Sequence, residues 1–145
     1  MTCEDTLVAA TRYAAWFSRV LWLVILINLS FAVPALFTPA AFHATLGLGT
    51  MDPAAAIWLR NAGMLLVLTN GFYCLVARNP LACISFTRWS AFARLIAAAF
   101  WIWLALCTKG FGVLWWFFAT DFSLGIVLGF LLWRASAASS SSGRM

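Results

Sequence analysis

Four long runs of hydrophobic residues, separated by short polar or helix-breaking segments, dominate the chain. We place them at about residues 19–37, 54–77, 88–107 and 110–133. Each run is close to the roughly 20 residues that a helix needs to cross the hydrocarbon core of a bilayer. The pattern predicts an all-α protein: a bundle of four transmembrane helices forming a single membrane domain over residues 1–145.

Residues that start or stop helices mark the ends of the second run. Asp52 and Pro53 precede it and predict a helix start, because proline is well suited to the first turn of a helix. Arg78, Asn79 and Pro80 follow it and predict its end. The run therefore has a defined start and a defined stop.

The third run is the least regular of the four. Its uncharged part, Leu95 to Cys107, is too short to span a bilayer, so the helix must reach back through Arg94 towards Arg88. Arg94 is therefore expected inside the hydrocarbon. After the fourth run the chain is rich in serine, and we expect a flexible tail over residues 135–145.

Composition agrees with a membrane protein. Hydrophobic residues make up 65% of the chain and charged residues 9%, against about 25% charged in soluble domains. The 145 residues leave room for short connections but not for a separate soluble domain. A net charge of +5 would favour nucleic acid in a soluble protein, but these cations flank the apolar runs, and we expect no nucleic-acid partner.

Positive charges are distributed unequally between the two ends of the predicted spans. One end has only Arg60 and Lys109. Cytoplasmic loops carry an excess of arginine and lysine, so we expect both termini in the cytoplasm. The arginines at the other end are Arg12, Arg19, Arg78, Arg88, Arg94, Arg134 and Arg144.

Tryptophans gather near both ends of the predicted spans. Tryptophan is enriched where a membrane protein meets the lipid headgroups, so we interpret these residues as interfacial anchors and not as a stacking site for a pigment or quinone. The outer group is Trp58, Trp101, Trp103, Trp115 and Trp116. The inner group is Trp16, Trp22, Trp89 and Trp133.

One acidic residue, Asp121, lies near the middle of the fourth run, about 17 Å from either end of the span. A carboxylate at that depth must face protein or a cavity, be protonated, or have a cationic partner. Arg94 differs from it in depth by roughly 5 Å, a gap that an extended arginine closes. We therefore predict an intramembrane ion pair. Arg60 is a second candidate partner, although it lies near the outer interface, where Asp52 or lipid headgroups could bind it instead.

The other two spans carry uncharged polar groups at middle depths, Asn28 in the first and Asn70 in the second. Each span thus offers one polar group to the interior of the bundle. Two interpretations remain open: hydrogen bonds and an ion pair that fix helix packing, or a buried site for a ligand or proton.

Small residues predict where the helices approach closely. Gly125 and Gly129 lie on the same face as Asp121, in the GxxxG spacing that brings membrane helices together. In the second span, Gly71 follows Asn70, and Gly63 lies on a similar side.

The cysteines and the histidine do not form a recognisable site. The four cysteines show neither a CxxC motif nor metal-ligand spacing, and we expect no metal. The lone His43 could be an axial haem ligand or a proton group, but a solvated or loop-packing histidine is the simpler interpretation. One histidine cannot provide a bis-histidine haem site.

Several short motifs lie in the first two thirds of the chain: Phe37-Thr38-Pro39, Leu46-Gly47-Leu48, Trp58-Leu59-Arg60-Asn61-Ala62-Gly63, Gly71-Phe72-Tyr73 and Ala77-Arg78-Asn79-Pro80. Together they resemble the small bacterial four-helix membrane proteins grouped as DoxX-like. The resemblance implies a four-helix bundle in a bacterial inner membrane and, in some relatives, a link to quinone-coupled thiol or sulfur oxidation. This chain departs from that chemistry because it has no paired-cysteine centre. Only the arginine of the Trp-Leu-Arg motif, Arg60, is carried over.

These features favour one function over two alternatives. The leading hypothesis is a non-catalytic accessory subunit that packs against other integral membrane subunits and lipid in an energy-transducing complex. The first alternative is a quinone-linked or lipid-processing oxidoreductase. In it, Arg94 and Asp121 form a buried polar site beneath Trp101, Trp115 and Trp116 that takes a quinone or lipid. The second is a small proton-coupled transporter that uses Asp121.

Overall fold

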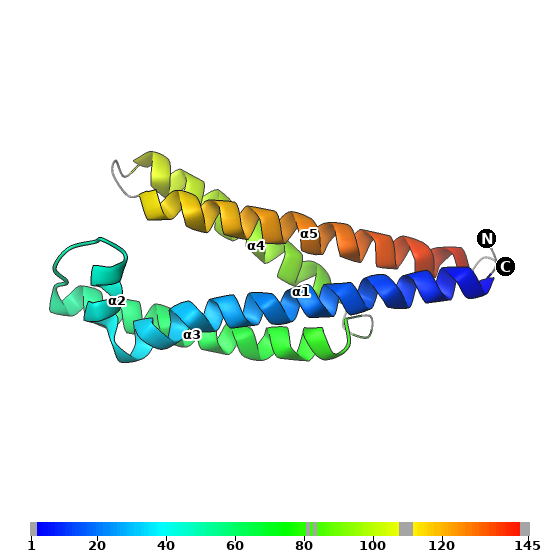
Figure 1. Ribbon diagram of the computed structural model, residues 1–145, viewed down its shortest axis with the longest axis horizontal. Helices are drawn as coiled ribbons and strands as arrows, with labels where there is room; N and C mark the ends of the chain where they lie inside the picture. The colour runs from blue at the N-terminus through cyan, green and yellow to red at the C-terminus, as the bar shows by residue number, and fades with distance from the viewer. Residues whose placement is uncertain (1–2, 81, 83, 108–111, 143–145) are drawn as a thin grey trace. The chain divides into compact units, whose positions relative to one another are not determined.

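The computed structural model of the protein describes residues 3–80, 82, 84–107 and 112–142 (Figure 1). These residues form five helices and no strand: α1 (Cys3–Phe37), α2 (Pro39–Thr45), α3 (Pro53–Arg78), α4 (Ile84–Cys107) and α5 (Gly112–Ser142). Four of the described helices contain a segment that is long and apolar enough to cross a membrane: Thr11–Phe37, Pro53–Arg78, Ser85–Cys107 and Gly112–Ala138. The predicted all-α class with four spanning helices is confirmed.

The chain, expected to form one membrane domain, divides into two compact packing units. The first unit contains the start of α1, as far as Leu21, and everything from Val76 onwards. The second contains residues Trp22–Leu75, which include the rest of α1, all of α2 and most of α3. The continuous helices α1 and α3 thus contribute to both units.

The first unit is built around the antiparallel pair α4 and α5, which lie side by side (Figure 1). Small residues of α4, Ala91 and Ala98, are buried and allow a close approach. The start of α1 adds Phe17, and α5 contributes Leu128 and Ala135, all nearly inaccessible to solvent. The core of this unit therefore consists of a few large apolar side chains set among alanines.

The second unit places α1 directly against α3 at Gly63. A Cβ atom added there would lie 3.0 Å from the carbonyl oxygen of Ala32 and 3.2 Å from the backbone nitrogen of Leu36. These atoms belong to the α1 backbone, so only a glycine allows the two helices to approach this closely.

The connection from α1 to α3 contains a helix that the sequence analysis did not anticipate, α2. It begins at Pro39, a residue suited to the first position of a helix. Gly47 and Gly49 then adopt the left-handed conformation, with φ of 72° and 79°. Asp52 ends the connection: its Oδ1 accepts a hydrogen bond of 2.6 Å from the backbone nitrogen of Ala54, which caps the start of α3 as expected.

The end of α5 differs from the prediction. The expected flexible tail is helical from residue 135 as far as Ser142, and residues 143–145 lie outside the described part of the chain. Alanines 135, 137 and 138 are strong helix formers, and Ala135 is 1% exposed, so both helix propensity and packing favour a helix at this point.

Two of the four predicted packing glycines make close helix contacts, and two do not. Gly63 contacts α1, and a Cβ on Gly125 would lie 2.7 Å from Cδ2 of Leu95 in α4. Gly71 and Gly129 have nothing within 4 Å of an added Cβ. Of the expected GxxxG pair, Gly125 therefore lies at a close helix contact and Gly129 does not.

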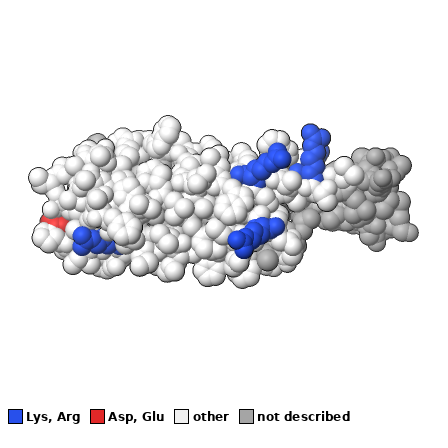
Figure 2. Space-filling model, turned by 60° about the horizontal axis from the view of Figure 1, so that its bottom comes forward, with Lys and Arg blue, Asp and Glu red and all other residues white. Residues whose placement is uncertain are grey.

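The outer surface of the described chain is largely apolar. At most 33% of the most apolar window of any span is buried within the protein. Figure 2 shows the consequence, a broad surface with very few charged side chains. Lipid or other membrane proteins must cover such a surface.

Replacing Gly63 with alanine should destabilise the second unit. The added methyl group meets helix backbone, which moves less easily than a side chain, and we expect a loss of about 1–3 kcal/mol in the free energy of unfolding. Gly71→Ala is the matched control on the same helix, where the open space predicts no loss and a gain of up to about 1 kcal/mol. Unfolding in detergent, followed by circular dichroism, measures both. Equal effects at the two positions would show that Gly63 is not a contact point.

Candidate functional site

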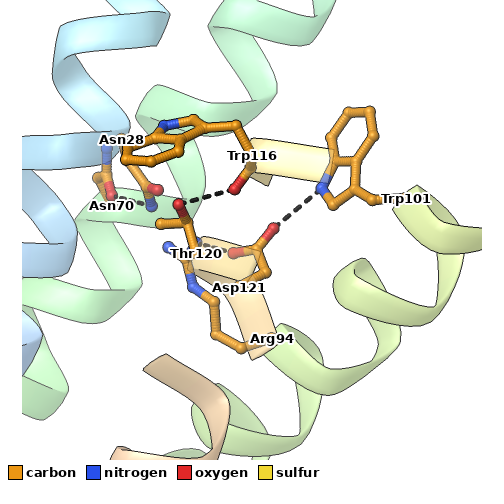
Figure 3. A network of polar contacts seen from close by, with 7 residues as sticks. All are labelled: Asn28, Asn70, Arg94, Trp101, Trp116, Thr120 and Asp121. Carbon is orange, nitrogen blue, oxygen red and sulfur yellow. Dashed lines mark hydrogen bonds and ion pairs between the residues drawn. The ribbon is translucent and has the colours of Figure 1, made fainter. Parts of the chain in front are cut away.

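A buried ion pair joins the two helices of the α4–α5 pair (Figure 3). Nη1 of Arg94 donates to Oδ1 of Asp121 at 2.5 Å. The two side chains are 10% and 11% exposed. The pairing expected from the depths of the two residues is therefore present.

Local sequence explains why these two side chains meet. Arg94 lies on α4 between Ala91 and Ala98, one turn away on either side, and both alanines are buried. Asp121 lies one turn before Gly125, where Leu95 and the Cβ of Arg94 fill the space next to the glycine. Small residues on both helices thus bring the backbones close enough for a direct salt bridge.

A tryptophan completes the site. Nε1 of Trp101 donates a hydrogen bond of 2.9 Å to the other carboxylate oxygen of Asp121, Oδ2. The indole also packs against Phe117, with ring centroids 5.1 Å apart, and Phe117 precedes Asp121 by one turn of α5. The carboxylate therefore accepts hydrogen bonds from a guanidinium on one oxygen and from an indole on the other.

The sequence analysis assigned Trp101 to the outer belt. It placed Trp101 above the site of Arg94 and Asp121 only in the oxidoreductase alternative, and it did not predict the hydrogen bond. A usable signal was present, because residues seven apart lie on the same helix face and Trp101 follows Arg94 by seven positions. Trp101 is also the half-buried member of the set. The other eight tryptophans, at 42–73% exposure, are placed as lipid-facing anchors would be: Trp16, Trp22, Trp58, Trp89, Trp103, Trp115, Trp116 and Trp133.

The electrostatics of the site favour an internally neutral arrangement. In a medium of low dielectric constant an isolated carboxylate is costly, and a guanidinium in contact offsets much of that cost. Hydrogen bonds to charged groups are stronger than neutral ones. Arg94, Asp121 and Trp101 together form a clamp between α4 and α5 that has no net charge.

The two asparagines form a separate contact within the second unit. Nδ2 of Asn28 on α1 donates a hydrogen bond of 2.9 Å to Oδ1 of Asn70 on α3. The residues are 5% and 3% exposed. Nδ2 of Asn70 has no hydrogen-bond acceptor among the described residues. This contact ties α1 to α3 near the close approach at Gly63.

Other predicted site residues are placed differently. Arg60 was grouped with the buried polar residues, but it is exposed and lies near the start of α3, two turns after Pro53. Nδ1 of His43 lies 3.2 Å from the carbonyl oxygen of Gly49, within the connection that follows α2. Three residues used in the sequence analysis, Cys83, Lys109 and Arg144, lie outside the described residues.

A metal centre has no support in the part of the chain that the structure describes. No group of three or more histidine, cysteine, aspartate or glutamate residues there could hold a metal ion. Cys74 and Cys107 carry free thiols.

The fold and the buried pair define an integral membrane protein with four spanning helices. No family model, curated protein or solved structure matches the chain.

The ion pair predicts a specific pattern in a double-mutant cycle. Asp121→Asn leaves the guanidinium of Arg94 buried without its counter-charge, and we expect a loss of about 3–5 kcal/mol in the free energy of unfolding. Arg94→Met should cost a similar amount. The double variant Arg94→Met/Asp121→Leu should cost much less than the sum of the two, because it removes both charges. Additive losses, measured by denaturation in detergent micelles, would contradict the pairing.

Trp101→Phe tests the second hydrogen bond of the carboxylate. The substitution keeps an aromatic ring but removes the indole donor, and we expect a loss of about 0.6–2 kcal/mol. Trp103→Phe is the matched control, since Trp103 is 58% exposed and should tolerate the change. The comparison uses the thermal unfolding of the two variants in the same detergent. Equal stability of the two variants would contradict the assignment of Trp101 to the site.

Proposed function

We propose that the protein is a non-catalytic accessory subunit of a larger energy-transducing membrane complex, in which the charged clamp keeps the α4–α5 pair in one fixed arrangement. The observation that carries the proposal is the engagement of both carboxylate oxygens of Asp121 by side chains of its own helix pair. A carboxylate held in this way supports helix packing. A proton carrier or ligand site instead needs an acid that can be approached and released.

The outer face of α4 supports the same proposal. Trp89, Phe92, Ile96, Phe100 and Trp103 follow one another at intervals of three or four residues, so they share one face, and they are 48–61% exposed. This face is opposite to the one that carries Arg94. A continuous row of large apolar side chains is suited to packing against lipid or against the helices of another membrane subunit.

Two alternative functions are an oxidoreductase and a transporter. In the first, the rings of Trp101 and Phe117 would stack on a quinone next to the ion pair. In the second, Asp121 would bind and release a proton. Both functions need Asp121 to exchange its partners during turnover. The contacts of Asp121 with Arg94 and Trp101 hold it in one arrangement and do not indicate such an exchange. The accessory role needs no rearrangement of the site.

We also propose that both termini face the cytoplasm of a bacterium, in accordance with the DoxX-like resemblance and the excess of arginine at one end of the spans. Within the first unit, Nη2 of Arg134 donates a hydrogen bond of 2.9 Å to the hydroxyl of Tyr13, so the start of α1 and the end of α5 lie on the same side. A fluorescent reporter that matures only in the cytoplasm, fused after Met145, should be bright. A fusion protein that is expressed but not fluorescent would show that the C-terminus faces away from the cytoplasm and would contradict the proposed topology.

Native mass spectrometry of the gently solubilised particle tests the accessory role. We expect a larger membrane partner in fixed stoichiometry, and a lower recovery of that partner with Asp121→Asn. Asp52→Asn is the matched control, because it makes the same chemical change at an exposed acid and asparagine still caps a helix. A stable isolated protein with its own activity, or a bound quinone that is lost with Asp121→Asn, would overturn the proposal.

A further inference from the structure

Five exposed arginines surround one end of the first unit. They lie in the first half of α1, at the end of α3, near the start of α4 and near the end of α5, and these segments belong to the same packing unit. We call this set the arginine collar: Arg12, Arg19, Arg78, Arg88 and Arg134. Figure 2 shows basic side chains on a surface that is mostly uncharged, with one acidic patch at its left end.

The collar lies at the depth of the lipid headgroups. Arg134 follows Asp121 by 13 positions along α5, which is about 20 Å at the helical rise. Arg88 precedes Arg94 by six positions along α4, about 9 Å further from the middle of the span. With the ion pair near mid-membrane and a hydrocarbon half-layer of about 15 Å, the backbone of Arg134 lies about 5 Å beyond the hydrocarbon edge and that of Arg88 about 6 Å inside it. An extended arginine side chain covers the latter gap, so both guanidiniums can reach the phosphates.

Aromatic side chains fix two of the collar guanidiniums in place. The guanidinium carbon of Arg134 lies 5.2 Å from the centre of the Tyr13 ring, and its Nη2 is hydrogen-bonded to the Tyr13 hydroxyl. The guanidinium carbon of Arg19 lies 5.0 Å from the centre of the Trp16 ring. A guanidinium has five N–H donors, so each keeps donors for an anion while its orientation is restricted.

The first unit contains three acidic residues, Glu4, Asp5 and Asp121, and the side chains of Glu4 and Asp5 lie outside the described ones. Among the acidic side chains that the structure describes in the first unit, Asp121 is buried and already paired with Arg94. The collar is therefore an exposed basic surface next to the membrane. Arginine forks match the oxygen geometry of phosphate groups.

We propose that the arginine collar binds the phosphate groups of anionic phospholipids in the membrane leaflet that faces it. Zwitterionic lipids carry a compensating positive charge and should bind more weakly. The inference does not depend on the accessory role, because a lipid surface of this kind would serve an enzyme or a transporter equally well.

The test measures which lipid the protein retains. The purified protein is incubated in detergent with equal amounts of phosphatidylglycerol and phosphatidylcholine, repurified, and its bound lipid is quantified by mass spectrometry. We expect a clear preference for phosphatidylglycerol, which falls about fivefold for each collar arginine changed to glutamine. Arg19→Gln/Arg134→Gln and Arg78→Gln/Arg88→Gln are two independent double variants, with circular dichroism as the check on folding. High salt should weaken the preference.

Arg60→Gln is the matched control, since Arg60 is exposed but lies in the second unit, outside the collar. It should leave the preference unchanged, and lysine at Arg19 and Arg134 should preserve most of it. Equal retention of the two lipids by the wild-type protein would overturn the proposal. An equal effect of Arg60→Gln would also overturn it, because total charge rather than the collar would then set the preference. Loss of a protein partner in the double variants, without any lipid preference, would identify an acidic protein surface as the occupant instead.

Discussion

A carboxylate in the middle of a hydrocarbon layer has no water to solvate it, and its own protein must supply a counter-charge and hydrogen bonds. Asp121 obtains both from α4, through Arg94 and Trp101. This requirement restricts the relative position of the two helices, because a slide of one turn, about 5 Å, would separate the charges. The small residues around the pair, above all Gly125, follow from the same constraint. They let the backbones approach until the side chains can touch.

The second unit solves the related problem of joining two apolar helices without charge. There α1 and α3 meet through a neutral hydrogen bond between Asn28 and Asn70, and through the bare backbone at Gly63. A neutral amide is far cheaper to bury than an ion, and in a membrane it still favours one partner strongly enough to help position a helix. The chain thus uses one charged contact and one uncharged contact, each within its own packing unit.

Much of this arrangement could be predicted from the sequence, because bilayer thickness and the cost of buried charge are strong constraints. The helix class, the start of α3 at Asp52 and Pro53, and the pairing of Arg94 with Asp121 follow from apolar run lengths and depths. The direct hydrogen bond from Trp101 to Asp121 was not predicted, because the position of Trp101 near the end of a span already explained it as an anchor. Gly71 and Gly129 show the converse: glycine spacing permits a close helix contact but does not say which neighbour comes near. The helical end of α5 depended on the burial of Ala135, which serine content does not reveal.

The most direct measurement of the central claim is the ionisation state of Asp121 in a lipid bilayer. The infrared difference spectrum between the wild-type protein and Asp121→Asn isolates the vibrations of this side chain. The account predicts bands of an ionised carboxylate, because a guanidinium and an indole both stabilise the negative charge. A band from a protonated carboxylic acid at neutral pH would contradict it. Asp121 would then be uncharged, and the charge of Arg94 would not be what allows its burial.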